Sequence, residues 1–172
     1  LFDSLSVFEN VVIGLVEHGE RRQDVLGNEA RRVLSAVGLL PNIREQGTEQ
    51  YEREYTNLGQ KRPSDLSGGM RKRVGVARAL VGQPEFVFYD EPTTGLDPVT
   101  SQQIDDMLKH VAQNIDVTSV VITHDMFSVF NIADHVVMLH EGKVQFDGTV
   151  EQLRASKDPN VVEFLERFEH SP

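Results

Sequence analysis

The stretch Leu66–Asp97, LSGGMRKRVGVARALVGQPEFVFYDEPTTGLD, determines the fold that this sequence predicts. A helix begins after Ser67, carries apolar residues at helical spacing and ends near Gly82. The next segment, residues 85–89, is apolar at nearly every position, which is typical of a strand buried on both faces of a sheet. Two carboxylates, Asp90-Glu91, end this strand. The stretch therefore predicts α/β structure with acidic groups at the carboxyl end of a strand.

Two amphipathic helices are predicted before this stretch, at residues 6–18 and 25–37, because apolar residues recur there at helical spacing. Ser6 and Glu9 have the spacing of a capping box, in which each side chain accepts a hydrogen bond from the backbone N–H of the other residue. The two helices are expected to pack their apolar faces on another part of the protein.

Residues 41–65 are polar, mixed in charge and poor in aliphatic side chains. We expect a solvated surface insertion that includes a short helix around residues 49–55. A loop that contacts a partner protein is the alternative interpretation.

The sequence after the opening stretch continues the alternation of helices and strands. Asp97-Pro98 has the residue types of a helix N-cap and first helical position. A second apolar strand, residues 117–123, precedes His124, and two further strands flank Glu141-Gly142 as in a hairpin. The remaining predicted elements are a short helix at 127–133, the hairpin strands at 136–139 and 143–146, a helix capped by Thr149 and Gln152, and a last helix from Asp158-Pro159 with Val161, Phe164, Leu165 and Phe168 on one face.

Alternating helices and buried strands predict a parallel-sheet α/β core. In such sheets the functional groups gather at the carboxyl ends of the strands. Asp90 and Glu91 follow one strand and His124 follows another. This placement predicts a functional site at that edge of the sheet.

Composition narrows the classes of function. The 172 residues have room for one domain with a sizeable core, and their formal net charge of -10 argues against a general nucleic-acid binder. The chain has no cysteine, which excludes disulfides and thiolate metal sites. No apolar run approaches the roughly 20 residues that a membrane-spanning helix needs.

The pair Asp90-Glu91 has a chemical interpretation as a phosphate-handling site. A magnesium ion offsets the charge of adjacent carboxylates, and Asp90 is the residue expected to hold it, directly or through water. Glu91 is expected to orient and polarise the water that attacks a phosphoryl group. The alternative is an acidic turn before Pro92 that binds nothing.

The helix start at Ser67-Gly68-Gly69 has two interpretations. Free backbone N–H groups and the helix dipole favour an anion there, and a plain helix start with a serine N-cap is the alternative. Asp97 similarly has a structural explanation as an N-cap. His124 either donates to a phosphate oxygen or is a hydrogen-bonded structural residue. The basic residues Arg71–Arg73 are either a solvated face or a local reinforcement of positive charge.

In their order and spacing, these features resemble those of the ATP-binding cassette (ABC) ATPases. Leu66–Met70 resembles the family signature sequence, and Phe86–Asp90 resembles the Walker B strand. Glu91 corresponds in this resemblance to the catalytic glutamate. Gly95–Asp97 resembles the D-loop and His124 the switch histidine.

A narrower resemblance is to the ATPase subunits of Mla/Mce-type lipid transporters. It rests on Met70, where glutamine is commoner in the wider family, followed by Arg71–Val74. The opening Leu1–Val7, the segment Ile132–His135 and the terminal Asp158–Leu165 are also similar to that group.

The phosphate-binding Walker A pattern G-x-x-x-x-G-K-[ST] does not occur in the 172 residues. The resemblance therefore implies a C-terminal fragment: a partial P-loop NTPase ABC cassette of α/β class, with a parallel-sheet core and a helical subdomain, whose N-terminal strands and P-loop are missing. The implied domains are a helical subdomain at 1–65 with the polar insertion at 41–65, the signature helix and RecA-like core at 66–148, and C-terminal helices at 149–172.

The resemblance implies an intact protein that binds ATP and Mg2+ and hydrolyses ATP. Asp90 is the expected metal ligand, and Glu91 and His124 are the expected catalytic residues. Ser67, Gly68 and Gly69 are expected to serve the nucleotide of a partner in a head-to-tail dimer with a second ABC ATPase subunit. Asp97 is a further expected cofactor-binding residue, at the dimer seam between the two nucleotide-facing surfaces. This chain by itself is expected to be inactive.

The same resemblance implies an integral-membrane permease as a partner, a phospholipid or other lipid as cargo, and a lipid-binding protein as a further partner. No nucleic-acid partner is expected. The implied location is peripheral, on the cytoplasmic face of the inner membrane. Two other functions stay open from the residues: a soluble ABC ATPase of DNA repair or the ribosome, and a cassette that only binds nucleotide or a partner.

Overall fold

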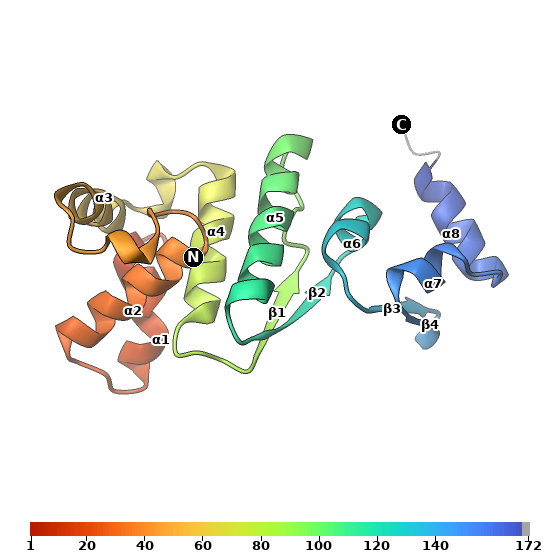
Figure 1. Ribbon diagram of the computed structural model, residues 1–172, viewed down its shortest axis with the longest axis horizontal. Coiled ribbons are helices and arrows are strands. Elements are labelled where there is room, and N and C mark those ends of the chain that lie inside the picture. The colour runs from red at the N-terminus through yellow and green to blue at the C-terminus, as the bar shows by residue number, and fades with distance from the viewer. Residues whose placement is uncertain (170–172) are drawn as a thin grey trace. The chain divides into compact units, whose positions relative to one another are not determined.

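The computed structural model describes residues 1–169, and Figure 1 shows the order of its helices and strands along the chain. These residues form two compact units, one of residues 1–122 and one that begins at Thr123. Among the described residues, no helix combines the length and the apolar character that crossing a membrane requires.

The first unit contains α1 (Val7–Glu17), α2 (Gln23–Ala36), η1 (Ile43–Glu45), α3 (Glu49–Gln60), η2 (Pro63–Asp65), α4 (Gly68–Leu80), β1 (Phe86–Asp90), α5 (Pro98–Asn114) and β2 (Thr118–Ile122). The second unit contains α6 (Met126–Ile132), β3 (Val136–His140), β4 (Lys143–Gly148), α7 (Val150–Arg154) and α8 (Pro159–Glu169). The alternation of helices and strands that the sequence predicts is confirmed, whereas the domain boundaries at 65 and 148 stay a prediction.

Helix α1 begins with the predicted capping box. Ser6 Oγ accepts a hydrogen bond from the Glu9 N–H at 3.2 Å, and Glu9 Oε2 accepts one from the Ser6 N–H at 2.7 Å. The fully buried side chain of Asn10 then holds the preceding segment. Its Oδ1 accepts from the Phe2 N–H at 2.8 Å, and its Nδ2 donates toward the carbonyls of Phe2, Leu5 and Ser6 at 3.0–3.1 Å. A polar residue thus fixes the entry of the chain into α1.

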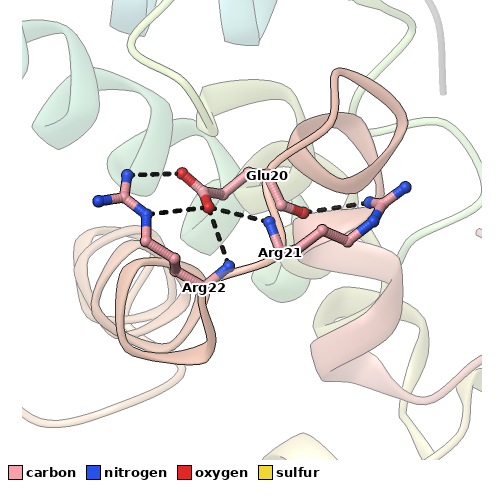
Figure 2. Close-up of polar contacts among 3 residues, drawn as sticks. All are labelled: Glu20, Arg21 and Arg22. Carbon is pink, nitrogen blue, oxygen red and sulfur yellow. Dashed lines mark hydrogen bonds and ion pairs between the residues drawn. The ribbon is translucent and has the colours of Figure 1, made fainter.

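The turn between α1 and α2 is closed by Glu20. Figure 2 shows its carboxylate accepting hydrogen bonds from the backbone N–H of Arg21 and from three nitrogens of Arg22, at 2.9–3.2 Å. Chiefly because of the Arg22 side chain, the pKa of Glu20 falls to about 2. This carboxylate organises the start of α2, where the N-cap Arg22 makes no side-chain capping bond of its own.

Helix α3 is longer than the short helix expected at residues 49–55, and its inner face is buried rather than solvated. Tyr51 has no exposed surface, and its hydroxyl lies 2.9 Å from Ser35 Oγ on α2. The Arg31 guanidinium stacks 3.9 Å from the centre of the Tyr55 ring and pairs with Glu52 at 2.7 Å. Two aromatic side chains spaced one helical turn apart therefore anchor a segment whose composition is mostly polar.

Strands β1 and β2 pair in parallel, as the α/β pattern predicts. The expectation that β1 is buried on both faces is wrong for the described residues, because burial alternates along the strand. Val87 and Tyr89 are buried, whereas Phe86 is 58% exposed and Phe88 is 68% exposed. The described sheet has only these two strands, and one of its faces is left open. The exposed apolar side chains on that face are Phe86, Phe88, Val120 and Ile122.

The second unit is built on the predicted hairpin. β3 and β4 are antiparallel, with a register irregularity between Met138 and Leu139. Arg154 lies over the ring of Phe130, 3.8 Å from its centre. The predicted last helix begins at Pro159, and the side chain of Phe168, expected on its apolar face, lies outside the described residues. The core of the unit is formed by Met126, Leu153 and Val161, with Val129, Phe130, Val136, Met138, Phe146 and Leu165 packed against it.

Candidate functional site

The start of helix α4 has the predicted serine cap. Ser67 Oγ accepts a hydrogen bond from the backbone N–H three residues further on, at 3.3 Å. The two glycines that follow allow close packing. A Cβ on Gly69 would lie 2.8 Å from Thr100 Cγ2, and one on Gly68 would lie 3.3 Å from Leu96 Cδ2. The first turn of α4 therefore packs against the turn before α5, which larger residues would push away.

Asp97 caps helix α5 as expected. Its Oδ1 accepts from the Thr100 N–H at 3.0 Å, and its Oδ2 accepts from the Thr100 hydroxyl at 2.5 Å. These hydrogen bonds, the side-chain one first, lower the pKa of Asp97. A hollow of about 400 Å3 is lined by Ser67–Met70 together with Gly95–Asp97. The structure thus brings Ser67, Gly68, Gly69 and Asp97 to one hollow, whereas their binding of a nucleotide stays a prediction.

Glu91 lies immediately after β1 in a constrained backbone conformation. Its N–H donates to the Ile122 carbonyl at 2.9 Å, which continues the pairing with β2. Its φ is +48°, in the left-handed region that non-glycine residues rarely adopt. The Thr94 hydroxyl donates to Glu91 Oε2 at 2.9 Å, so the carboxylate is held within its own turn. Asp90, one residue earlier, is exposed and lies opposite Ile122.

The basic residues that follow Gly68 and Gly69 on helix α4 contact backbone carbonyls. Arg71 donates to the carbonyl of Leu66 at 2.7 Å, and Arg73 donates to that of Val37 at 2.7 Å. Lys72 Nζ donates to the carbonyl oxygen of Glu91 at 3.2 Å. The solvated-face interpretation is therefore wrong for Lys72 and Arg73, which are half-buried and donate to carbonyls of other elements.

The sequence analysis does not identify two hydrogen-bond partners of Glu91, which are Thr94 and Lys72. Thr94 carries a signal that was available, since a hydroxyl three residues after a carboxylate in a tight turn is placed to bond it. No sequence signal points to Lys72, because its contact with Glu91 depends on how α4 packs beside the end of β1.

His124 lies in the second unit, two residues after the end of β2, and is exposed. Its predicted action at the same site as Glu91 stays a prediction. Within residues 1–169, no group of three or more His, Asp or Glu side chains is arranged to hold a metal ion. Asp90 offers a single exposed carboxylate, and this donor fits Mg2+, which takes few protein oxygens and keeps several waters.

A family model described as ABC transporter matches residues 1–94, more than half of the chain. The chain belongs to the ABC transporter family. The ABC match includes the capped start of α4, strand β1 and the Glu91 turn up to Thr94.

Relatives in the ABC family carry more than one transport role. The intermembrane phospholipid transport system ATP-binding protein MlaF of Haemophilus influenzae is 33% identical over 172 residues, all of this chain and 59% of MlaF. The methionine import ATP-binding protein MetN of Carboxydothermus hydrogenoformans is 37% identical over 150 residues, 87% of this chain and 40% of MetN. The chain thus spans less than two thirds of the length of each relative.

A solved structure supports the same fold. The ATP-binding cassette MJ0796, in a dimeric post-hydrolysis state bound to ADP and Pi, matches with a TM-score of 0.64 and 27% sequence identity. The match covers 87% of this chain and 59% of the MJ0796 chain. The predicted fold class, part of an ABC cassette of mixed α/β structure with a small parallel sheet, is confirmed.

Proposed function

We propose that this chain is part of the ATP-binding and ATP-hydrolysing subunit of an ABC transporter whose cargo is a phospholipid or another lipid. The observation that carries the proposal is the Glu91 turn: in a chain of the ABC family, a glutamate at the end of β1 is held in a left-handed conformation with its carboxylate fixed by Thr94. The similarity to MlaF over the whole chain supports a lipid cargo.

In this proposal ATP and water react to ADP and phosphate. Glu91 accepts a hydrogen bond from the water and polarises it for attack on the γ-phosphorus, while the bond from that phosphorus to the bridging oxygen breaks. His124 donates a hydrogen bond to a γ-phosphate oxygen. Asp90 would hold Mg2+, which when bound would neutralise charge on the phosphate oxygens.

The surface formed by Ser67, Gly68, Gly69 and Asp97 serves the other side of the nucleotide in this proposal. Backbone N–H groups at the start of α4 and the Ser67 hydroxyl contact the ATP held by a second ABC subunit in a head-to-tail dimer. Two features support this role: the four residues line one hollow, and the solved relative MJ0796 is dimeric.

The remaining partners follow from the transport role. Helices α1 and α2 contact an integral-membrane permease, and the subunit lies on the cytoplasmic face of the inner membrane. A lipid-binding protein delivers or receives the cargo. The 172-residue chain, purified without further sequence, is expected to show no magnesium-dependent ATP hydrolysis.

The test is ATP hydrolysis by the full-length protein in complex with its permease. Glu91→Gln keeps the size of the side chain but removes its charge, and it is expected to lower kcat by about 10²- to 10⁴-fold. Glu45→Gln makes the same change at an exposed position and is the matched control. Equal activity of Glu91→Gln and Glu45→Gln would refute the catalytic role of Glu91.

The similarity to MetN makes methionine import a second candidate function. The complex in vesicles separates the two, because a lipid transporter hydrolyses ATP in step with movement of a labelled phospholipid between vesicles. A methionine importer instead accumulates labelled methionine. Methionine uptake without phospholipid movement would overturn the lipid assignment while leaving the ATPase assignment intact.

A further inference from the structure

The Glu91 turn is held from two directions in the structure. The Thr94 hydroxyl donates to the Glu91 carboxylate at 2.9 Å, and the Thr94 N–H lies 3.3 Å from the Glu91 carbonyl oxygen. Lys72, on helix α4, donates to that same carbonyl at 3.2 Å. The hydroxyl contact therefore holds the side chain, and the two contacts with the carbonyl oxygen hold the peptide plane that follows it.

The peptide plane matters because Glu91 has a φ of +48° and precedes Pro92. Left-handed backbone is disfavoured for a residue with a Cβ, so the conformation persists only where surrounding contacts determine it. Rotation of the peptide between Glu91 and Pro92 changes ψ of Glu91 and moves Thr94, whose hydroxyl holds the carboxylate, relative to the Glu91 side chain. A cation that bonds the carbonyl oxygen opposes this rotation.

Lys72 is also part of the helix whose first turn forms the Ser67–Gly69 surface. It lies three residues after Gly69, and its side chain is half-buried. The hydrogen bond from Lys72 to Glu91 therefore joins the signature helix directly to the residue after β1. Any displacement of the start of α4 reaches the Glu91 turn through this contact.

We infer that Lys72 and Thr94 are positioning residues that hold Glu91 in the orientation required for water activation, with Lys72 linking that orientation to the signature helix. This inference rests on the proposed function. Neither residue is expected to touch the nucleotide, so both act on kcat and leave ATP binding unchanged.

The experiment uses the full-length protein in complex with its permease and compares two matched pairs of variants. Lys72→Met removes the donor and Lys72→Arg keeps it, while Thr94→Val removes the hydroxyl and Thr94→Ser keeps it. Lys61→Met, at an exposed lysine of the same unit, controls for the loss of one positive charge. Steady-state ATP hydrolysis gives kcat and KM, and amide hydrogen exchange measures protection of the turn at residues 91–95.

The expected result is a kcat about 10- to 100-fold lower in Lys72→Met and Thr94→Val, with KM changed by less than about twofold. Lys72→Arg and Thr94→Ser are expected to restore kcat, and the turn is expected to exchange faster only in the variants that lose a donor. If Lys72→Met does not fold, the Thr94 pair carries the test.

Three results would overturn the inference: kcat of Lys72→Met equal to that of Lys61→Met, a raised KM with unchanged kcat, or unchanged exchange of the turn in both donor-loss variants. The last readout needs no activity. A wild-type complex that hydrolyses no ATP would instead refute the proposed function, so the two failures are distinguishable.

Discussion

Replacing Tyr51 tests whether the polar segment before the signature helix is a structural part of the fold. Tyr51 has no exposed surface, and its hydroxyl bonds Ser35 on α2. Truncating a buried aromatic side chain to alanine costs about 3–5 kcal/mol, and the lost hydrogen bond adds about 1 kcal/mol. Tyr51→Ala is therefore expected to destabilise the protein by about 4–6 kcal/mol, and Tyr51→Phe by about 1 kcal/mol.

Urea unfolding followed by amide circular dichroism measures both effects. With a slope of about 2 kcal/mol per molar urea, Tyr51→Ala is expected to lower the unfolding midpoint by about 2–3 M and Tyr51→Phe by about 0.5 M. Asn57→Ala, on the exposed side of α3, is the matched control and is expected to change stability by less than about 0.5 kcal/mol.

A result for Tyr51→Ala no larger than that for Asn57→Ala would refute this reasoning and restore the interpretation of the segment as a solvated insertion. A double-mutant cycle with Ser35→Ala isolates the hydroxyl pair. Because the two hydroxyls bond each other, the effects of Tyr51→Phe and Ser35→Ala are expected not to add.

Two further predictions concern a buried polar group, Asn10, and a half-buried one, Glu29. Asn10→Ala removes four hydrogen bonds at the start of α1 and is expected to cost about 2–4 kcal/mol in thermal or urea unfolding, with Asn10→Asp costing more because a carboxylate then faces carbonyl oxygens. Glu29 has a pKa held below 4.5 by Arg32 and by the Gly82 N–H, so its contribution to stability is present above about pH 4.5 and is lost as pH falls through the lowered pKa. The stability difference between wild type and Glu29→Gln, measured by urea unfolding from neutral to acid pH, should therefore shrink with acidification, and a constant difference would contradict this.

Local patterns in the sequence predict most of the elements of the fold. The capping box at Ser6, the N-cap at Asp97 and the hairpin at Glu141-Gly142 depend on neighbouring residues, and the structure confirms all three. The buried inner face of α3 is not predicted, because Tyr51 and Tyr55 lie among polar residues in the sequence. The polar composition of the segment therefore gives no sign that these two side chains pack against the rest of the fold. The open face of β1 escapes it as well, because an apolar run does not tell which of its faces another element covers.

The residues of the candidate site likewise include some that the sequence predicts and some that it misses. Residue types and spacing predict Ser67, Gly68, Gly69 and Asp97 as cofactor-binding residues, and in the structure all four line one hollow. Lys72 is missed because its contact with Glu91 joins residues 19 positions apart through the packing of α4. The pattern of a single sequence shows the periodicity of residues along a helix or strand. It does not show which side chain will donate a hydrogen bond to a carbonyl of another element.

At Glu91 the left-handed backbone conformation places the proposed catalytic role in conflict with the stability of the folded protein. Left-handed geometry costs a residue with a side chain about 1–2 kcal/mol, and glycine would adopt it without that penalty. Selection for higher thermal stability would therefore favour Glu91→Gly. This substitution would raise stability but remove the carboxylate on which the proposed ATP hydrolysis depends. Stabilisation is better directed at positions such as the exposed face of α3, where sequence can change without altering the turn after β1.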